Sequence, residues 1–423
     1  MKNVIREYQK KIIICLCVIA FSIISGFLLL CTVHLLPVDN INKNIQKYIT
    51  RVEYNEFIDD YVGTRIDTYT DSIMLNEAAC PIEAPVIEKA IYNYQVTYLQ
   101  QYSQQENLLR YLKGEEGYGY VGYTHYWGGH QVFLKILLQF FEYSDIKMMN
   151  LILQTMLLVI IIIGFIKKKK DHLVIPITLA LLSIVPSVIG VCFQYSSVYY
   201  LALIGTAVIL WGLEKITAEK IYLLFLLLGI CTSYIDFLTF PLITLGIPLL
   251  VFVEMEREER RIKDFEKMVF LSFVWGMGYL GMWGGKWILG SLLLPESGAI
   301  SEALRALRYR GSNEADGNII NLYDVLLENI FVYIKWPLII VIIIYLIVRL
   351  SKSIKNKTFC KKRITDNVIL LFPALYPIGW FFISKNHSYH HAFMTYRILS
   401  ISLLAGLCFI SEVTNCNKES MKI

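Results

Sequence analysis

The segment from Ile12 to Val33 has no charged side chain over 22 positions, and this run most constrains how the chain can fold. A helix of about 20 apolar residues spans the roughly 30 Å hydrocarbon core of a bilayer. The whole chain has a similar character, because 56% of its 423 residues are hydrophobic and only 18% are charged. A soluble domain has about a quarter charged residues. An integral membrane protein is therefore predicted, and disorder or a disulfide scaffold is excluded.

Apolar runs of similar length recur along the chain, separated by polar segments. Together they predict an all-α polytopic membrane protein with about ten transmembrane helices. The first run is expected to be a retained signal anchor, because it exceeds the roughly 7–15 residues of a signal-peptide core and no A-x-A cleavage site follows. The expected spans are residues 12–33, 150–166, 173–193, 198–213, 221–235, 240–253, 268–289, 331–350, 367–384 and 392–413.

Basic residues near the ends of these runs predict which side of the membrane each loop occupies. Four consecutive lysines, Lys167–Lys170, follow the second span, and Arg257 and Arg260 lie in a later charged loop. Short loops rich in Lys and Arg stay in the cytoplasm, so both chain ends are expected there. The predicted organisation is a signal anchor over 1–36, a large helical extracytoplasmic loop over 37–148, transmembrane helices 2–7 over 149–291, a second extracytoplasmic loop over 292–329, and transmembrane helices 8–10 with a short cytoplasmic tail over 330–423.

Charge and polarity also narrow the class of partner. The net charge of +5, from 40 basic and 35 acidic residues, is too balanced to predict a nucleic-acid partner. Function is expected where ionisable groups approach the bilayer in fixed positions, since burying such groups in lipid is unfavourable. Four polar clusters stand out, and the predicted topology places all four on the extracytoplasmic side.

The first cluster contains Asp67 and Asp71. On a helix these carboxylates lie one turn apart on the same face, and their repulsion raises one of the two pKa values. Such a pair suits a general base, and it could also hold a divalent metal through hard oxygen ligands. The alternative is a solvated helix start, with Asp71 capping the helix from Ser72 onward.

The second cluster, Tyr118–His130, interleaves five aromatic residues and two histidines with four glycines. Aromatic faces such as those of Tyr126 and Trp127 can stack on a sugar ring, while His130 can form hydrogen bonds to it. An aromatic belt at the membrane interface is the alternative. His125 and His130 are five residues apart and do not share a helical face, so the spacing disfavours a metal site.

The third cluster is Trp283-Gly-Gly-Lys286-Trp287, near the end of the seventh span. A lysine beside two glycines can approach an anion closely and act as a point charge. A lysine that reaches from the span to the interface is the alternative. Arg305, Arg308 and Arg310 follow in the second polar loop with the spacing of one helical face, which suits phosphate binding as well as a solvated surface.

The fourth cluster combines His387, His390 and His391 with Arg397 in the last span. A wholly lipid-facing arginine is unfavourable, so Arg397 is expected to face the bundle interior, where it could hold a phosphate through two parallel hydrogen bonds. Pairing with Asp236, at the turn after the fifth span, is the alternative. The histidines are candidate hydrogen-bond donors or acid–base groups, and Asp236 could reach the same polar site.

Several short motifs together resemble those of a group of largely uncharacterised polytopic bacterial membrane proteins associated with cell-surface polysaccharide assembly. The resemblance covers most of the chain, and it departs from the group's Arg-Tyr-Trp-His-Gly pattern at His125 and Gly128. More distantly, the layout is similar to that of the GT-C glycosyltransferases, which carry a catalytic carboxylate in the first large outer loop. The motifs are Asp67–Asn76, Tyr126–Gly129, Ser233–Pro241, Trp283–Trp287, and Asn386–His391 with Arg397.

The resemblance implies a multi-pass glycosyltransferase of the bacterial cytoplasmic membrane, with its active side extracytoplasmic. It would transfer sugar from a polyprenyl-phosphate donor to a cell-envelope glycan, with no cofactor implied beyond a divalent metal. Its catalytic candidates are Asp67 and Asp71. Its substrate-binding candidates, which would hold the lipid phosphate or the sugar, are Tyr126, Trp127, His130, Asp236, Lys286, Arg305, His387, His391 and Arg397.

Three other functions remain open on the sequence alone. A lipid-linked glycan flippase or transporter would carry ionisable residues near the bilayer midplane, and the lack of charge in the inner halves of most spans disfavours it. A non-enzymatic glycan-binding protein of envelope assembly would tolerate substitution of the two acids but not of Trp127. An outer-leaflet polymerase or acyl-group enzyme that uses the histidines is the third.

Overall fold

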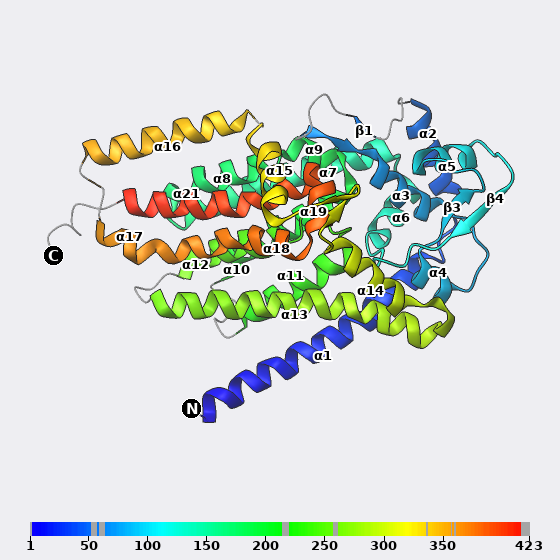
Figure 1. The fold of residues 1–423 in the computed structure, drawn as a ribbon, viewed down its shortest axis with the longest axis horizontal. Coiled ribbons are helices and arrows are strands. Elements are labelled where there is room, and N and C mark those ends of the chain that lie inside the picture. Colours follow the sequence, from blue (N-terminus) through cyan, green and yellow to red (C-terminus); the bar gives the residue numbers. More distant parts are fainter. Residues whose placement is uncertain are drawn as a thin grey trace.

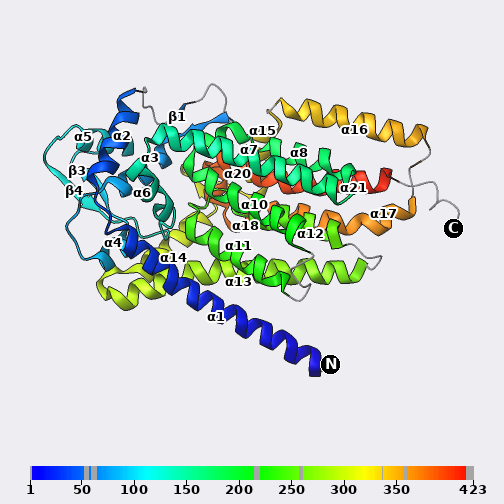
Figure 2. The same ribbon diagram turned by 180° about the vertical axis from the view of Figure 1, so that it is seen from behind.

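The computed structural model of the chain describes residues 2–51, 57–58, 64–213, 220–256, 261–335, 337–356, 358 and 361–415. Most helices run roughly side by side in a long bundle, and a group of short helices and strands lies at one end of it (Figures 1 and 2). The beginning of the first helix and the end of the last lie toward the opposite end (Figure 1). Arg257 and Arg260, which orient one predicted loop, lie outside the described residues.

The bundle is held by apolar side chains and by close backbone approaches. A Cβ atom added at Gly229 would lie 2.1 Å from the Trp275 carbonyl oxygen, so only glycine lets these two helices pack so tightly. Its elements are α1 (Lys2–Val33), α7 (Tyr143–Lys167), η2 (Asp171–Leu173), α8 (Val174–Ser183), α9 (Pro186–Val191), α10 (Phe193–Gly212), α11 (Ile221–Ile235), α12 (Ile243–Glu256), α13 (Arg261–Leu293), α15 (Leu322–Ile334), α16 (Leu338–Lys355), α17 (Lys361–Asn367), η4 (Val368–Leu375), α18 (Tyr376–Ile383), α20 (Ala392–Thr395), η5 (Tyr396–Leu399) and α21 (Ser400–Thr414).

The group of short elements, here called the head, falls within the predicted loop 37–148 and has its own apolar core. Met74, Leu75, Leu108 and Leu134 are fully buried in it. Its helices are α2 (Asp39–Arg51), α3 (Thr68–Ala79), α4 (Val86–Tyr92), α5 (Gln104–Leu112) and α6 (Gln131–Phe140). Its strands form two antiparallel pairs, β1 (Phe57–Ile58) with β2 (Ile66–Asp67) and β3 (Gln95–Tyr98) with β4 (Tyr118–Val121).

Five helices in the described part of the chain are long and apolar enough to cross a membrane, or six if one bent pair counts as a single span. The structure therefore confirms a mainly helical chain with several membrane-spanning candidates. The total of ten spans, their sidedness and the GT-C layout stay predictions. The five are Gln9–Val33, Tyr143–Lys167, Phe193–Gly212, Arg363–Ile383 and Ala392–Thr414.

Two of the predicted spans are broken in the structure. The run 173–193 divides into α8 and α9, because Val185 takes a left-handed backbone conformation with φ 60° and Pro186 starts the next helix. The run 331–350 divides between α15, which ends at Ile334, and α16, which begins at Leu338. These two helices lie at an angle of 85° to each other. Hydropathy alone does not reveal such breaks, since the residues on both sides are equally apolar.

Polar segments that are far apart in the sequence meet beside the head. The second predicted loop contributes η3 (Pro295–Ser297), α14 (Ala299–Arg310), β5 (Glu314–Ala315) and β6 (Asn318–Ile319), and the histidine segment forms α19 (Lys385–His390). The Thr124 hydroxyl donates to the Glu302 carboxylate, which joins the head to α14. Asn386 Nδ2 donates to the Glu314 carbonyl at 2.6 Å, which joins α19 to β5. The four polar clusters thus share one end of the bundle.

Candidate functional site

A cavity of about 800 Å³ lies between the head and the adjoining end of the bundle. Its volume falls in the range of ligand-binding clefts, about 300–1,000 Å³. Its lining comes from the start of α3, the aromatic segment before α6, the turn after α11, and from α14, α19 and α20. The polar and aromatic lining residues include Arg65, Asp67, Thr70, Tyr123, His125, Tyr126, Phe237, Arg310, His387, His390 and His391.

Asp67 is the carboxylate that lines this cavity. It caps the N-terminus of α3, where one carboxylate oxygen accepts from the Thr70 amide at 2.9 Å and the other from the Thr70 hydroxyl at 2.8 Å. Burial raises the pKa of Asp67, and the two bonds from Thr70 oppose that rise. A carboxylate with a raised pKa is a better proton acceptor than an exposed one.

Asp71, one turn further along α3, faces a buried interface instead of the cavity. Its carboxylate accepts from the Tyr143 hydroxyl at 2.6 Å and from the Phe193 amide at 3.1 Å, and Lys147 Nζ lies 3.8 Å away. Burial raises the pKa of Asp71 to about 6, although Lys147 lowers it. Asp71 therefore joins α3 to α7 and α10.

The structure does not bring Asp67 and Asp71 together as a metal site. Each carboxylate is held by its own set of hydrogen bonds. Across the described residues, no group of three or more His, Cys, Asp or Glu side chains is arranged to hold a metal ion.

His387 of α19 and His391, which directly follows this helix, form a pair in the lining of the cavity. The rings of His387 and His391 lie 4.6 Å apart, and His387 Nε2 lies 2.8 Å from the Leu238 carbonyl oxygen. Burial, His390 and Arg310 together lower the pKa of His391 to about 4. Burial and the neighbouring His391 also lower the pKa of His387. Both rings are therefore neutral at pH 7 and can donate or accept hydrogen bonds.

Two arginines supply the positive charge of the cavity. The Arg310 guanidinium lies 4.9 Å from the centre of the Tyr126 ring, and its Nη1 is buried without a hydrogen-bond partner in the described part of the chain. The Arg65 guanidinium lies 5.0 Å from the Phe393 ring. Arg305, by contrast, is 79% exposed on α14 and lies 3.7 Å from Glu302. Arg310 thus reaches the cavity from the same helix on which Arg305 faces away.

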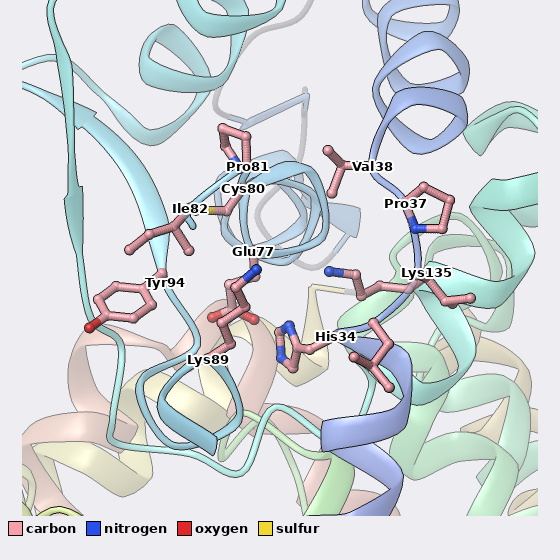
Figure 3. A pocket seen from close by; sticks show the side chains of 12 residues that line it. His34, Pro37, Val38, Glu77, Cys80, Pro81, Ile82, Lys89, Tyr94 and Lys135 are labelled. Atoms are coloured by element: carbon pink, nitrogen blue, oxygen red, sulfur yellow. The ribbon is translucent and has the colours of Figure 1, made fainter. Parts of the chain in front are cut away.

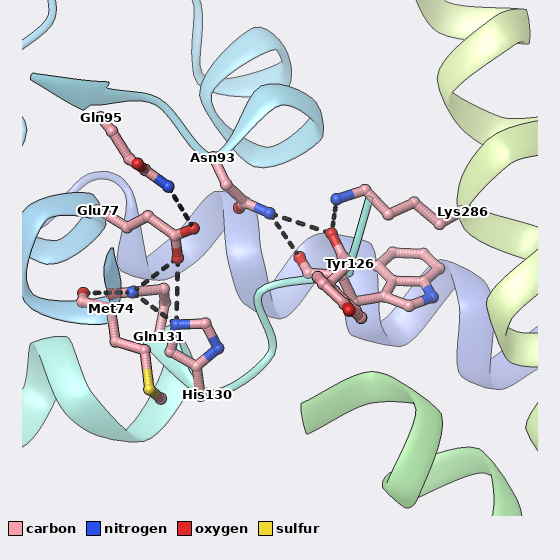
Figure 4. A network of polar contacts seen from close by, with 9 residues as sticks. Met74, Glu77, Asn93, Gln95, Tyr126, His130, Gln131 and Lys286 are labelled. Carbon is pink, nitrogen blue, oxygen red and sulfur yellow. Dashed lines mark hydrogen bonds and ion pairs between the residues drawn. The ribbon is translucent and has the colours of Figure 1, made fainter. Parts of the chain in front are cut away.

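The Tyr126–Gly129 motif contributes one ring to the cavity and otherwise holds the head to the bundle (Figure 4). Trp127 is 1% exposed, and its indole N–H donates to the Met282 carbonyl at 2.7 Å. The Tyr126 carbonyl accepts from the Lys286 ammonium and from Asn93 Nδ2. A Cβ atom at Gly128 (φ +74°) would lie 2.6 Å from the Asn93 side chain, which explains the glycine at this position.

His130 is also buried, in a network centred on Glu77 (Figure 4). Its Nε2 lies 3.1 Å from one Glu77 carboxylate oxygen, which also accepts from Gln131 Nε2 at 3.1 Å. The other oxygen accepts from Gln95 Nε2 at 3.3 Å. The His130 ring packs 4.8 Å from Phe237, a wall residue of the cavity, so the network supports the wall from behind.

Arg397 and Asp236 are buried separately and hold the backbone. Arg397 Nε donates to the Ile184 carbonyl at 3.0 Å, at the break between α8 and α9. Its Nη1 donates to the Phe393 carbonyl at 2.9 Å. Asp236 accepts from the amide and the hydroxyl of Thr239 at 3.1 and 2.6 Å. Arg397 therefore satisfies a carbonyl that the broken helix leaves without an intrahelical partner.

The cavity thus gathers some sequence-selected residues and omits others. Asp67, Tyr126, His387 and His391 line it, whereas Asp71, Trp127, His130, Asp236, Lys286, Arg305 and Arg397 do not. Arg310 was expected only as one of three arginines on a helical face, and the structure places it, not Arg305, in the lining of the cavity. No sequence pattern marks Glu77 or Asn93 as a site residue, because their importance comes from partners that are distant in the sequence.

No protein-family model matches the chain, and no curated protein and no solved structure matches it either. The resemblance to polysaccharide-assembly proteins and the likeness to GT-C glycosyltransferases therefore stay predictions.

Proposed function

We propose that the chain is a membrane glycosyltransferase that moves a sugar from a polyprenyl-phosphate donor to a cell-envelope glycan. The observation that carries the proposal is the cavity beside the head. A buried carboxylate, two guanidinium groups, neutral histidines and tyrosine rings line one space of about 800 Å³. The sequence-based topology adds that this end of the bundle faces the extracytoplasmic side.

Asp67 is the proposed base. In the reaction the acceptor hydroxyl gives its proton to the Asp67 carboxylate, and its oxygen bonds to the anomeric carbon of the donor sugar. The bond from that carbon to the phosphate oxygen breaks, and the lipid phosphate leaves with the electron pair. Asp67 suits this role because burial raises its pKa, and a base with a raised pKa accepts a proton more readily.

Arg310 and Arg65 are the proposed contacts of the departing phosphate. A guanidinium can bind two phosphate oxygens at once, and it stabilises the negative charge that grows as the bond breaks. This assignment replaces Lys286 and Arg397, which do not line the cavity and whose side chains donate to backbone carbonyl groups. Tyr123 and Tyr126 offer faces for a sugar ring, while His387 and His391 offer hydrogen bonds.

The test is the variant Asp67→Asn, since asparagine keeps a capping oxygen but cannot accept the proton. Transfer should fall by a factor on the order of 10² to 10⁴ with the unfolding temperature nearly unchanged. The assay follows release of polyprenyl phosphate from a panel of polyprenyl-phosphate sugars in membranes. Glu116→Gln, at an exposed site of the head, is the matched control. Undiminished release in Asp67→Asn would refute the assigned base.

Glycan binding without transfer is the second candidate. It is favoured by the hydrogen bonding of Asp67, because both carboxylate oxygens already serve as the cap of α3. On this reading Asp67→Asn retains binding of a glycan fragment with about the affinity of the unchanged chain. Arg310→Met and substitution of the tyrosines would still weaken binding, so the two candidates separate in a binding assay run beside the transfer assay.

A further inference from the structure

A second, smaller cavity lies on the other side of the Glu77 network, at the end of α1 next to the head. Its volume is about 210 Å³. Its lining combines the segment His34–Val38, which directly follows α1, with Cys80 and the side chains of Glu77, Lys89 and Lys135 (Figure 3). The volume is below the roughly 300–1,000 Å³ of drug-sized ligand pockets, so it suits a single small group.

Lys135 is the residue that sets the chemistry of this cavity. It lies on α6 and is 2% exposed, and its ammonium group points into the cavity (Figure 3). No described residue gives this ammonium a hydrogen bond or an ion pair. Lysine is almost never fully buried unless it is paired, because removing an ammonium group from water is unfavourable unless an anion or a hydrogen-bond acceptor replaces the lost hydration. The Lys135 ammonium faces the cavity and has no partner among the described residues, so an anion in the cavity can pair with it.

Lys89 adds a second positive charge to the cavity, and His34 adds a neutral polar group. Lys89 of α4 extends into the same space, and His34 Nε2 is buried there without a hydrogen-bond partner in the described part of the chain (Figure 3). Glu77 is the acid in the lining, but its two oxygens already accept from Gln95 and Gln131, with His130 beside them. The lysines are therefore left to attract an anion from outside the chain.

The ionisation of these groups agrees with an anion site. Burial and the nearby Lys89 lower the pKa of Lys135 to about 8, so it keeps its proton at pH 7. Burial, together with Lys135 and Lys89, lowers the pKa of His34 to about 2, so its ring is a neutral hydrogen-bond partner. A bound anion would attract both ammonium groups and so offset the repulsion between the two lysines.

The place of the cavity in the fold identifies the kind of anion. α1 is one of the candidate membrane spans, and the cavity begins at the residue after its last turn. Leu35, in the same segment, is 69% exposed. The end of a span lies at the depth of lipid headgroups, where phosphate is the abundant anion. Lysine binds phosphate as a compact point charge with three donors.

We propose that this cavity binds one phosphate group through Lys135 and Lys89, with the neutral His34 ring as a further hydrogen-bond partner. The phosphate belongs either to a lipid headgroup or to a soluble phosphate or phosphate ester. The site is separate from the large cavity, since the Glu77–His130 pair and Phe237 lie between them. It stands whether or not the chain transfers sugar.

The test uses the purified full chain in a phosphate-free neutral detergent and two arms. The first arm adds inorganic phosphate and compares it with chloride at equal ionic strength. The second adds phosphatidylglycerol and compares it with a neutral glycolipid that has no phosphate. Both arms record the shift in unfolding temperature and the dissociation constant from native mass spectrometry, and neither needs an activity assay.

We expect a phosphate-specific rise in unfolding temperature in at least one arm, and the arm that responds identifies the source. Lys135→Met and, separately, Lys89→Met should weaken that binding about tenfold or more, because each removes a charge-assisted hydrogen bond. Lys113→Met, at an exposed position of the head, should bind as the unchanged chain does. No shift in either arm would overturn the proposal. A shift in the two cavity variants as large as that of the unchanged chain would also overturn it.

Discussion

The cavity at the start of α3 and the buried interface one turn further along this helix use the same residue type in different ways. The Asp67 carboxylate at the cavity is held mainly by Thr70, three residues away, and Gln194 of α10 also donates to the Asp67 backbone carbonyl at 3.1 Å. Asp71 at the interface is held by Tyr143 and the Phe193 amide, from two other helices. An acid with local partners can turn to a ligand without disturbing the fold. An acid with distant partners holds the fold together, although its position in the sequence suggests a catalytic role just as much.

Asp71→Ala should give the largest effect, and the effect should be on stability. The substitution removes the acceptor of two hydrogen bonds and leaves Lys147 buried without its carboxylate. Breaking a buried ion pair from one side costs about 3 kcal/mol or more. Denaturant titration of the detergent-purified protein measures the loss. If this variant unfolds like the unchanged chain yet loses activity, the division of roles between the two acids is wrong.

The pH dependence of stability gives an intermediate effect. The pKa of Asp71 rises from 3.8 to about 6 in the folded chain, so folded Asp71 keeps a proton that the unfolded chain has released. The resulting stabilisation is complete below pH 4 and is lost as the pH rises through 6. The unfolding temperature should therefore fall between pH 4 and pH 6.

Asp71→Asn tests the source of this pH dependence, because asparagine does not titrate. Burial also raises the pKa of Asp236 to about 6 and raises that of Asp67, so the slope should decrease rather than vanish. Thermal unfolding at pH 4, 5, 6 and 7 gives both slopes. Equal slopes in the variant and the unchanged chain would show that Asp71 is charged over the whole range.

Thr70→Val should give the smallest effect, and the effect should be on the proton-transfer step. Valine removes the hydroxyl that donates to Asp67 and leaves the Thr70 amide in place. The pKa of Asp67 should rise slightly further, so the acid limb of the kcat/KM profile moves to higher pH. Thr97→Val on β3 is the control. A profile that does not move would separate Asp67 from the reaction.

Several structural features could be predicted from the sequence. The end of α1 at Val33 and the bounds of α11 (Ile221–Ile235) coincide with the expected segments, because both depend on continuous local apolarity, although α11 is shorter than the five candidate spans. The break at Val185 was missed, since its cause is a backbone conformation between two apolar runs. The expectation that Arg397 faces the interior agrees with its burial, but its partner is the Ile184 carbonyl that this break frees.

The sequence by itself determined the helical, membrane-spanning character of the chain and the residue types available for chemistry. Those properties follow from composition and charge patterns that are local to each segment. Only the tertiary structure decided that Asp67 and Arg310 share a cavity and that Lys286 and Trp127 hold the head to the bundle. It also decided that Lys135 is buried with no partner among the residues that the structure describes. The physical reason is that a polar side chain acquires its role from the groups that approach it, and these lie far away in the sequence.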